Sequence, residues 1–245
     1  MRFKRIRRFL GAIVLPVGMS LIIASAPVEV EARNFLNKIL GKEKVEEKHD
    51  SKKSKDKKKK SASEVNINEL SLDDNIAYPP VPEKQKLAIK EYMTGVAKNL
   101  AKRKTAKIET MRDGEVVVAT LGTDLMFAPN DTVLLPGSKE LLKQYKELLR
   151  SPGRYKILLV VHTDDTGSDE YTDRLSELRV DAVYNEIVGK EAPQSAVITY
   201  ALGATEPLLP NISRANRAAN RRLEIFIVPD QKLINLAKSN KLNSK

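Results

Sequence analysis

The sequence contains no cysteine and no tryptophan, and it has only two histidines. Without cysteine the chain forms no disulfide bond and no thiolate metal site, and it carries no lipid on an N-terminal cysteine. One histidine, His49, lies in a lysine-rich segment, so His162 has no histidine partner for a metal site. The sequence also lacks a G-x-S-x-G motif and a glycine-rich phosphate loop. We therefore expect no metal, no cofactor and no catalytic activity.

The second part of the chain has little net charge, and this excludes another class of function. Residues 1–60 contain 17 of the 43 Lys and Arg residues and 7 of the 32 Asp and Glu residues. Residues 61–245 therefore contain 26 basic and 25 acidic residues and are almost neutral. A nucleic-acid-binding domain carries a basic face on its fold. We expect no nucleic-acid partner.

The N-terminal residues have the layout of an export signal. Residues 1–32 contain a basic start followed by an apolar run at 9–26 and small residues near Ala32. We favour a signal peptide that is cleaved after Ala32. The alternative is an uncleaved membrane anchor, for which the apolar run is only just long enough.

Residues 33–82 predict a disordered linker. They are rich in lysine, with ten lysines in residues 42–60, and they contain three prolines near their end. Such a segment buries too little apolar surface to offset its ordering entropy. It acts either as a solvated spacer or as a polycation that lies along anionic lipid headgroups or other anionic polymers.

Ordered structure is expected from residue 83 onward. Residues 83–122 predict an amphipathic helix over about 84–103 and a β-hairpin that turns at Asp113-Gly114, packed as an extension on the following domain. In residues 123–229 helix and strand patterns alternate. The helices start at Ser138 and Ser168, and the strands cover 157–161, 197–202 and 223–228. The predicted fold class is α/β: a two-layer sandwich of β-α-β-α-β type, with helices on one face of a mixed sheet. Residues 230–245 form a tail with a short helix.

Arg179 is out of place in this pattern. The helix that follows Ser168 has a core-facing stripe that includes Leu175, Leu178 and Val183, and Arg179 lies along its edge. A buried guanidinium keeps its charge and needs a partner. Asp164, at the end of the preceding strand, either forms an internal salt bridge with Arg179 or binds a ligand ammonium group while Arg179 binds a ligand carboxylate. In the second case the ligand is a zwitterion.

The motifs around these two residues resemble those of a known family. Val161-His162-Thr163-Asp164, Gly167 and Leu175-Ser176-x-x-Arg179 are followed by Gly203, Pro207 and Arg217-Ala-Ala-Asn-Arg-Arg-Leu-Glu-Ile225. In this order and spacing they resemble the OmpA-like C-terminal domain, which associates with peptidoglycan. The resemblance covers about residues 120–228.

The resemblance implies a non-covalent site for the diaminopimelate residue of peptidoglycan stem peptides. Family members hold its amino and carboxylate groups with the residues that correspond to Asp164 and Arg179. The implied site also includes Thr163, Thr172 and, from the N-R-R run, Arg222. Thr172 stands where the family usually has Asn, so one ligand hydrogen bond is in doubt. Ala201 replaces the first glycine of the usual G-x-G.

The resemblance implies that the protein tethers an envelope component to the cell wall from the periplasm, associated with the outer membrane or the wall. The expected partners are peptidoglycan and, in addition, a membrane surface or an outer-membrane protein. Two alternatives remain open. One is an inner-membrane-anchored, stator-like protein, although residues 9–26 contain no acidic residue for ion flow. The other is a wall hydrolase with a metal at His162 and Asp164.

Overall fold

The computed structural model describes residues 66–189 and 193–242. The predicted signal peptide or anchor and the lysine-rich tract lie outside these residues. None of the helices in the described part is long and apolar enough to cross a membrane.

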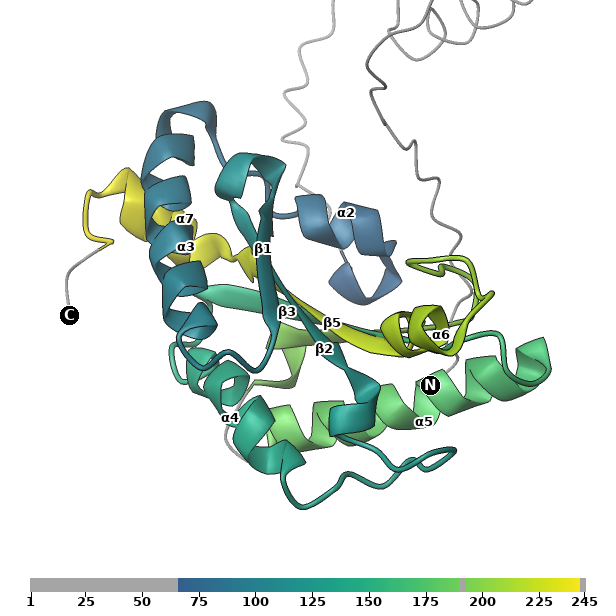
Figure 1. Cartoon of the computed structure of the whole chain (residues 1–245). Coiled ribbons are helices and arrows are strands. Elements are labelled where there is room, and N and C mark those ends of the chain that lie inside the picture. The colour runs from purple at the N-terminus through teal and green to yellow at the C-terminus, as the bar shows by residue number, and fades with distance from the viewer. Residues whose placement is uncertain (1–65, 190–192, 243–245) are drawn as a thin grey trace, which may run out of the picture. The chain divides into compact units, whose positions relative to one another are not determined.

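The helices and strands follow the predicted order (Figure 1). The α-helices are α2 (Leu72–Ala77), α3 (Lys86–Ala101), α4 (Ser138–Leu148), α5 (Asp169–Val188), α6 (Arg214–Asn220) and α7 (Gln231–Lys238). The strands are β1 (Lys107–Met111), β2 (Val116–Gly122), β3 (Tyr155–His162), β4 (Val197–Gly203) and β5 (Arg222–Pro229). Short 3-10 turns are η1 (Ile67–Glu69), η2 (Glu83–Gln85), η3 (Arg112–Gly114), η4 (Thr123–Leu125) and η5 (Gln194–Ala196).

The five strands form one mixed sheet in the order β1-β2-β5-β3-β4. Strands β3 and β4 are parallel and the other pairs are antiparallel. The hairpin turns at Asp113, as predicted, and β2 pairs with β5. The hairpin therefore widens the sheet itself and is not a separate layer packed on it.

One face of the sheet carries the main helices. Helices α3, α4, α5 and α7 bury apolar side chains against the residues that alternate along β2, β3 and β5. Ser168 caps α5 by accepting a hydrogen bond from the Tyr171 amide, as predicted. The predicted stripe of α5 needs one correction, because Leu178 is exposed. The buried side chains of α5 are those of Thr172, Ser176, Arg179, Val180, Val183, Ile187 and Val188.

The opposite face is covered by a segment that the sequence analysis assigned to the disordered linker. Leu72 and Ile76 of α2 pack on apolar side chains of β3, β4 and β5. Residues 66–82, here called the N-terminal strap, are therefore structured, and helices are not confined to one face. The helix is only six residues long, which is too short for an apolar period to be recognised.

A buried polar network holds the strap in place. Asn75 Nδ2 donates to Tyr200 Oη at 2.6 Å and to the Ile67 carbonyl at 2.8 Å. Lys156 of β3 donates from Nζ to Asn75 Oδ1 at 2.9 Å and to the Tyr78 carbonyl. Because Asn75 and Lys156 are both buried, these bonds fix the position of the strap as well as stabilising it.

Candidate ligand-binding site

The candidate site lies beyond the carboxyl end of β3, on the face that carries α5. Thr163 and Asp164 follow β3 directly, and Thr172 and Arg179 are on the inner side of α5. All four are buried. Open α/β sheets commonly present functional side chains at the carboxyl ends of their strands.

Asp164 is held by two donors. Its Oδ2 accepts a hydrogen bond from Arg221 Nη1 at 2.7 Å, and its Oδ1 accepts one from the Thr166 amide at 2.9 Å. Burial by itself raises the pKa of this carboxyl, but the bonds from Arg221 and Thr166 outweigh it and lower the pKa. Asp164 is therefore ionised at neutral pH. A carboxylate accepts about four hydrogen bonds, so it keeps capacity for a further donor.

Arg221 joins two carboxylates from different strand ends. Its Nε and Nη2 donate to Asp124 at 3.0 and 2.7 Å, in the two-pronged geometry that guanidinium groups favour. The hydrogen bonds to Asp124 and then Asp164 raise the pKa of Arg221. Neither Arg221 nor Asp124 was singled out from the sequence.

Arg222, which the family resemblance placed in the pocket, lies elsewhere. Its Nε donates to Glu224 Oε1 at 3.0 Å, and its Nη1 contacts the carbonyls of Glu206 and Asn220. Successive strand residues point to opposite faces, and Leu223 packs in the core beneath α5. Arg221 therefore shares the α5 side with Leu223, and Arg222 points to the other side. This alternation is the signal in the sequence that could have distinguished Arg221 from Arg222.

Arg179 is a buried cation with neutral partners. Its side chain is 3% exposed. Nε donates to the Asp131 carbonyl at 2.9 Å, Nη2 donates to the Ala128 carbonyl at 3.3 Å, and the guanidinium lies 5.0 Å from the centre of the Phe127 ring. In the described residues no carboxylate lies within 4.0 Å of Arg179, so the predicted internal salt bridge with Asp164 is not formed.

The burial of Arg179 also affects its pKa. Burial lowers its pKa, and Arg221 lowers it further, while the nearby charge of Asp124 opposes the shift. A guanidinium remains protonated at any physiological pH. Asp124, Asp164, Arg179 and Arg221 together have no net charge, so a zwitterion keeps the site neutral when it binds.

The remaining predicted residues have different roles in the structure. Thr172 Oγ1 donates to the Asp169 carbonyl at 3.0 Å, so its hydroxyl is already engaged within α5. Thr163 donates from its amide to the Gly203 carbonyl at 2.8 Å. The hydroxyl of Thr163 is buried and has no hydrogen-bond partner among the described residues. A buried donor without a partner is uncommon, and Thr163 directly precedes Asp164 in the sequence.

Gly203 brings β4 close to α5 at this edge. Its φ of 50° lies in the left-handed region, which glycine adopts without strain. A side chain here would meet Asp173 and the backbone after Thr172. The Gly203 amide donates to Ser176 Oγ at 3.1 Å, which fixes the two elements together.

His162 and Asp164, which the hydrolase alternative combines at one metal, have separate partners. His162 lies beneath the other face of the sheet, with Nε2 at 3.4 Å from Glu224 Oε2. No group of three or more potential ligands that could hold a metal ion occurs in the part of the chain that the structure describes. The arrangement is suited to binding a charged ligand, with Arg179 and Asp164 as groups of opposite sign.

Comparison with known proteins assigns the family. The OmpA family profile matches residues 126–221, which include Asp164, Arg179 and Arg221. The Escherichia coli protein YfiB is 33% identical over 108 residues, which are 44% of this chain and 68% of YfiB. The chain belongs to the OmpA family. The predicted resemblance is confirmed.

Other OmpA-family relatives match over part of their length. The E. coli protein YiaD is 25% identical over 133 residues, which are 54% of this chain and 61% of YiaD. The peptidoglycan-binding protein ArfA of Mycobacterium tuberculosis is 28% identical over 109 residues, which are 44% of this chain and 33% of ArfA. The matched part thus spans less than two thirds of either relative.

Proposed function

We propose that the OmpA-like domain of this protein binds peptidoglycan without covalent chemistry and tethers an envelope component to the cell wall. The bound group is the diaminopimelate residue of a stem peptide, with its ammonium on Asp164 and a carboxylate on Arg179. The similarity to ArfA, which is named for peptidoglycan binding, supports the class of ligand.

The observation that carries the proposal is the environment of Arg179. Burying a charge without a counter-charge is unfavourable, and this cation has only carbonyl and aromatic partners among the described residues. Those bonds use two of its five donor hydrogens. A ligand carboxylate would supply the missing negative charge and accept two parallel hydrogen bonds.

Ligand entry requires the loop between η4 and α4 to move. This loop supplies both carbonyls on Arg179, and the exposed fractions of Arg179 and Asp164 are only 3% and 7%. The loop itself is held by little regular structure: one isolated bridge joins Phe127 and Leu134. Its outer side chains Val133 and Leu135 are exposed. Opening the loop would give a stem peptide access to the guanidinium.

A single stem should bind weakly. Hydrogen bonds to charged groups contribute about 1.5–3 kcal/mol each, from which the ordering of the ligand and the loop must be subtracted. The expected dissociation constant for one stem is on the order of micromolar to millimolar. This is sufficient for a tether, because the wall presents stems at high local concentration.

The test is retention of the full chain on purified sacculi. Arg179→Met keeps the apolar stem in the core and removes the charge, and Arg174→Met on the exposed side of the same helix is its matched control. We expect Arg179→Met and Asp164→Asn to lose most of the retention, and free diaminopimelate to compete with the unaltered protein. Circular dichroism checks that each variant is folded.

Arg221 and Arg222 provide a second, sharper comparison. If the site is the one described, Arg221→Met weakens retention, because it frees Asp164 and Asp124 from their shared cation. Arg222→Met leaves retention unchanged in folded protein. Equal retention of the Arg179, Asp164 and control variants would remove the basis of the proposal.

A further inference from the structure

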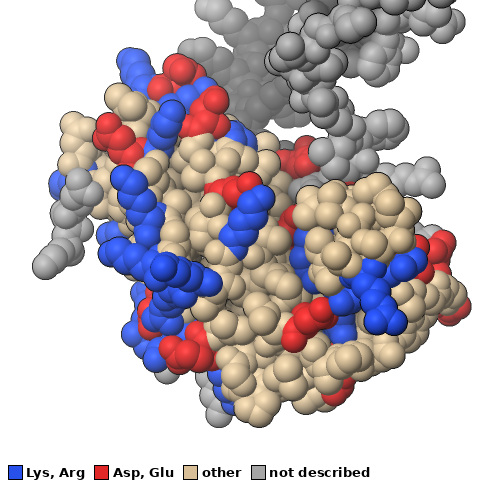
Figure 2. Space-filling view, in the orientation of Figure 1, with Lys and Arg blue, Asp and Glu red and all other residues tan. Residues whose placement is uncertain are grey.

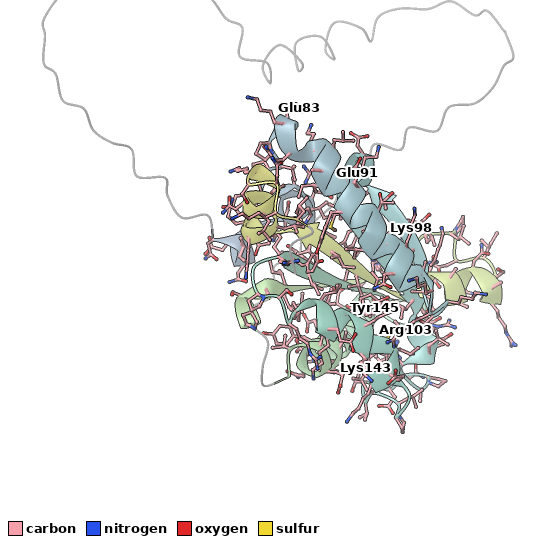
Figure 3. All side chains as sticks on the ribbon, turned by 90° about the vertical axis from the view of Figure 1, so that its left-hand side faces the viewer. Glu83, Glu91, Lys98, Arg103, Lys143 and Tyr145 are labelled. Carbon is pink, nitrogen blue, oxygen red and sulfur yellow. The ribbon has the colours of Figure 1, made fainter. Side chains whose placement is uncertain are left out.

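A cluster of basic side chains occupies one corner of the helix layer, and none of its members is one of the proposed ligand-binding residues. We define the α3–α4 basic patch as Lys98, Lys102, Arg103, Lys104, Lys107 and Lys143. Residues 98–107 contain five basic residues and no acidic one, and all six members of the patch are exposed. Figure 3 shows Lys98, Arg103 and Lys143 along the same side of the molecule. Figure 2 shows Lys and Arg gathered around the lower end of α3.

The fold assembles this patch from four parts of the chain. Arg103, in the turn after α3, contacts Glu140 of α4 at 3.2 Å, and Lys143 contacts the same carboxylate at 3.7 Å. Lys107, at the start of β1, pairs with Glu109 at 2.9 Å. Helix α3, the turn, β1 and α4 thus bring their cations to one corner although α4 is distant in the sequence.

Half of the patch has no acidic partner. In the described residues no carboxylate lies within 4.0 Å of Lys98, Lys102 or Lys104. Lys104 also has a φ of 53°, a left-handed conformation that glycine adopts more readily than lysine. The chain therefore places a cation at a turn position that local backbone preference gives to glycine.

The patch is a local excess of charge on an otherwise balanced domain. Residues 61–245 have 26 basic and 25 acidic residues, so positive charge at this corner is matched by negative charge elsewhere. One such region is the outer side of α5, where Asp169, Glu170 and Asp173 are joined by Glu177 and Asp181. An approaching polyanion would be attracted to the α3–α4 corner and repelled from α5.

We infer that the α3–α4 basic patch is a docking surface for an anionic phospholipid bilayer. Its three unpaired lysines are all exposed and lie within seven residues of one another, which suits a surface of dense negative charge more than a discrete ligand. Residues 98–107, which contain five of its six members, have no aromatic side chain on which a nucleic-acid base would stack. Their only exposed apolar side chain is that of Ala101, so the contact is electrostatic and does not insert into the bilayer. This inference is independent of the stem-peptide site.

The ten lysines of residues 42–60 carry the same sign of charge. They would bind the same bilayer, so the test must separate the patch from net charge. The patch variant is Lys98→Gln with Lys102→Gln and Lys104→Gln. Its matched control is Lys84→Gln with Lys232→Gln and Lys238→Gln, three exposed lysines that also lack an acidic partner among the described residues. Both variants lose the same charge from the full chain.

The measurement is co-sedimentation with vesicles of equimolar phosphatidylglycerol and phosphatidylcholine, and with vesicles of phosphatidylcholine alone. Each lysine near an anionic surface changes binding by about fivefold. The patch variant should therefore bind the anionic vesicles at least about tenfold more weakly than the control variant, with the difference shrinking as salt is added. Binding to phosphatidylcholine alone should be the same for the two variants, because it does not depend on the charge of the patch.

Three results would overturn the inference. Equal losses in the two variants would mean that net charge alone governs binding. Unchanged binding of the patch variant would leave the patch without a role at the bilayer. Patch-dependent binding to single-stranded DNA or to sacculi, without patch-dependent binding to vesicles, would assign the surface to another polyanion. Retention of the Arg179 variant on sacculi is measured separately, so the two proposals fail independently.

Discussion

Replacing Lys156 by methionine tests whether the N-terminal strap seals the second face of the sheet. The Lys156 side chain is 3% exposed, and its ammonium group meets Asn75 Oδ1 and the Tyr78 carbonyl but no carboxylate within 4.0 Å in the described residues. Burial lowers the pKa of this lysine from 10.5 to about 8. Methionine keeps the apolar stem and removes the charge.

The shift in the pKa of Lys156 determines how much, and in which direction, the free energy of unfolding changes with pH. A difference of 2.5 pKa units between 10.5 and about 8 corresponds to about 3 kcal/mol. Below pH 8 the lysine is charged in both the folded and the unfolded chain, so it contributes no pH dependence. Between pH 8 and 10.5 the unfolded chain binds more protons, and the free energy of unfolding rises with pH. Relative to Lys156→Met, the unaltered protein should thus gain about 3 kcal/mol from pH 7 to pH 11.

The assay is urea unfolding of both full chains at several pH values between 7 and 11, followed by far-ultraviolet circular dichroism because the chain has no tryptophan. Taking the difference between the two proteins removes the titration of the other groups. The absolute difference at pH 7 is a poor test, because the substitution also leaves Asn75 Oδ1 without its donor. Parallel curves over the whole range would refute the reasoning, since they would mean that Lys156 is solvated and the strap does not cover it.

Three further predictions concern the sheet and its edges. The pKa of Glu224 is lowered from 4.5 to about 2, because its contacts with His162 and Arg222 outweigh the effect of burial. Glu224 therefore stabilises the fold above pH 4.5 by about 3 kcal/mol, and this stabilisation is lost as the pH falls towards 2. Glu224→Gln should flatten this part of the acid-unfolding curve. Ile76→Ala should lower the free energy of unfolding by about 2 kcal/mol in urea, because a side chain that is 4% exposed leaves the second core, whereas alanine at the exposed Leu87 should change it by under about 0.5 kcal/mol. Gly203→Ala should lower the melting temperature, because the left-handed backbone at this position costs alanine about 1–2 kcal/mol. The control is Gly137→Ala, where the added methyl group meets nothing within 4 Å. Equal melting temperatures of the two variants would contradict the close approach of Gly203 to α5.

The main layers of the fold could be predicted because their patterns are long. Helices α3, α4 and α5 show apolar periods over many residues, and the runs of apolar residues in β3 and β5 mark buried strands. The Asp113-Gly114 pair predicted the turn of the hairpin, and the preference of serine for the N-cap position predicted the start of α5 at Ser168. Local signals of this kind do not depend on distant parts of the chain.

The strap could not be predicted in the same way. Helix α2 has six residues, and its stability comes from Asn75, Lys156 and Tyr200, which are far apart in the sequence and meet only when the sheet has formed. The composition predicted disorder instead, because lysine and proline dominate the residues on either side of the strap. A single polar side chain that joins three segments leaves no local pattern.

The site was predicted in part. The sequence identified Arg179 as a cation among apolar residues, and the structure buries it without a carboxylate in the described part of the chain. The partner of Asp164 was missed, because the choice between Arg221 and Arg222 depends on which face of β5 each occupies. The carbonyls of the loop before α4 were also missed, since any residue type provides them and the sequence gives no sign of their direction.

Strand β3 connects the strap to the candidate site. Lys156 near its beginning holds the strap on one face, and Asp164 follows its end on the other. If the chain is pulled from its N-terminal side while the wall holds Asp164 and Arg179, the tension runs along β3. The covalent backbone between Lys156 and Asp164 carries this tension, and the hydrogen bonds to β4 on one side and β5 on the other keep the loaded strand in register. A strand at the edge of the sheet would be held from one side alone.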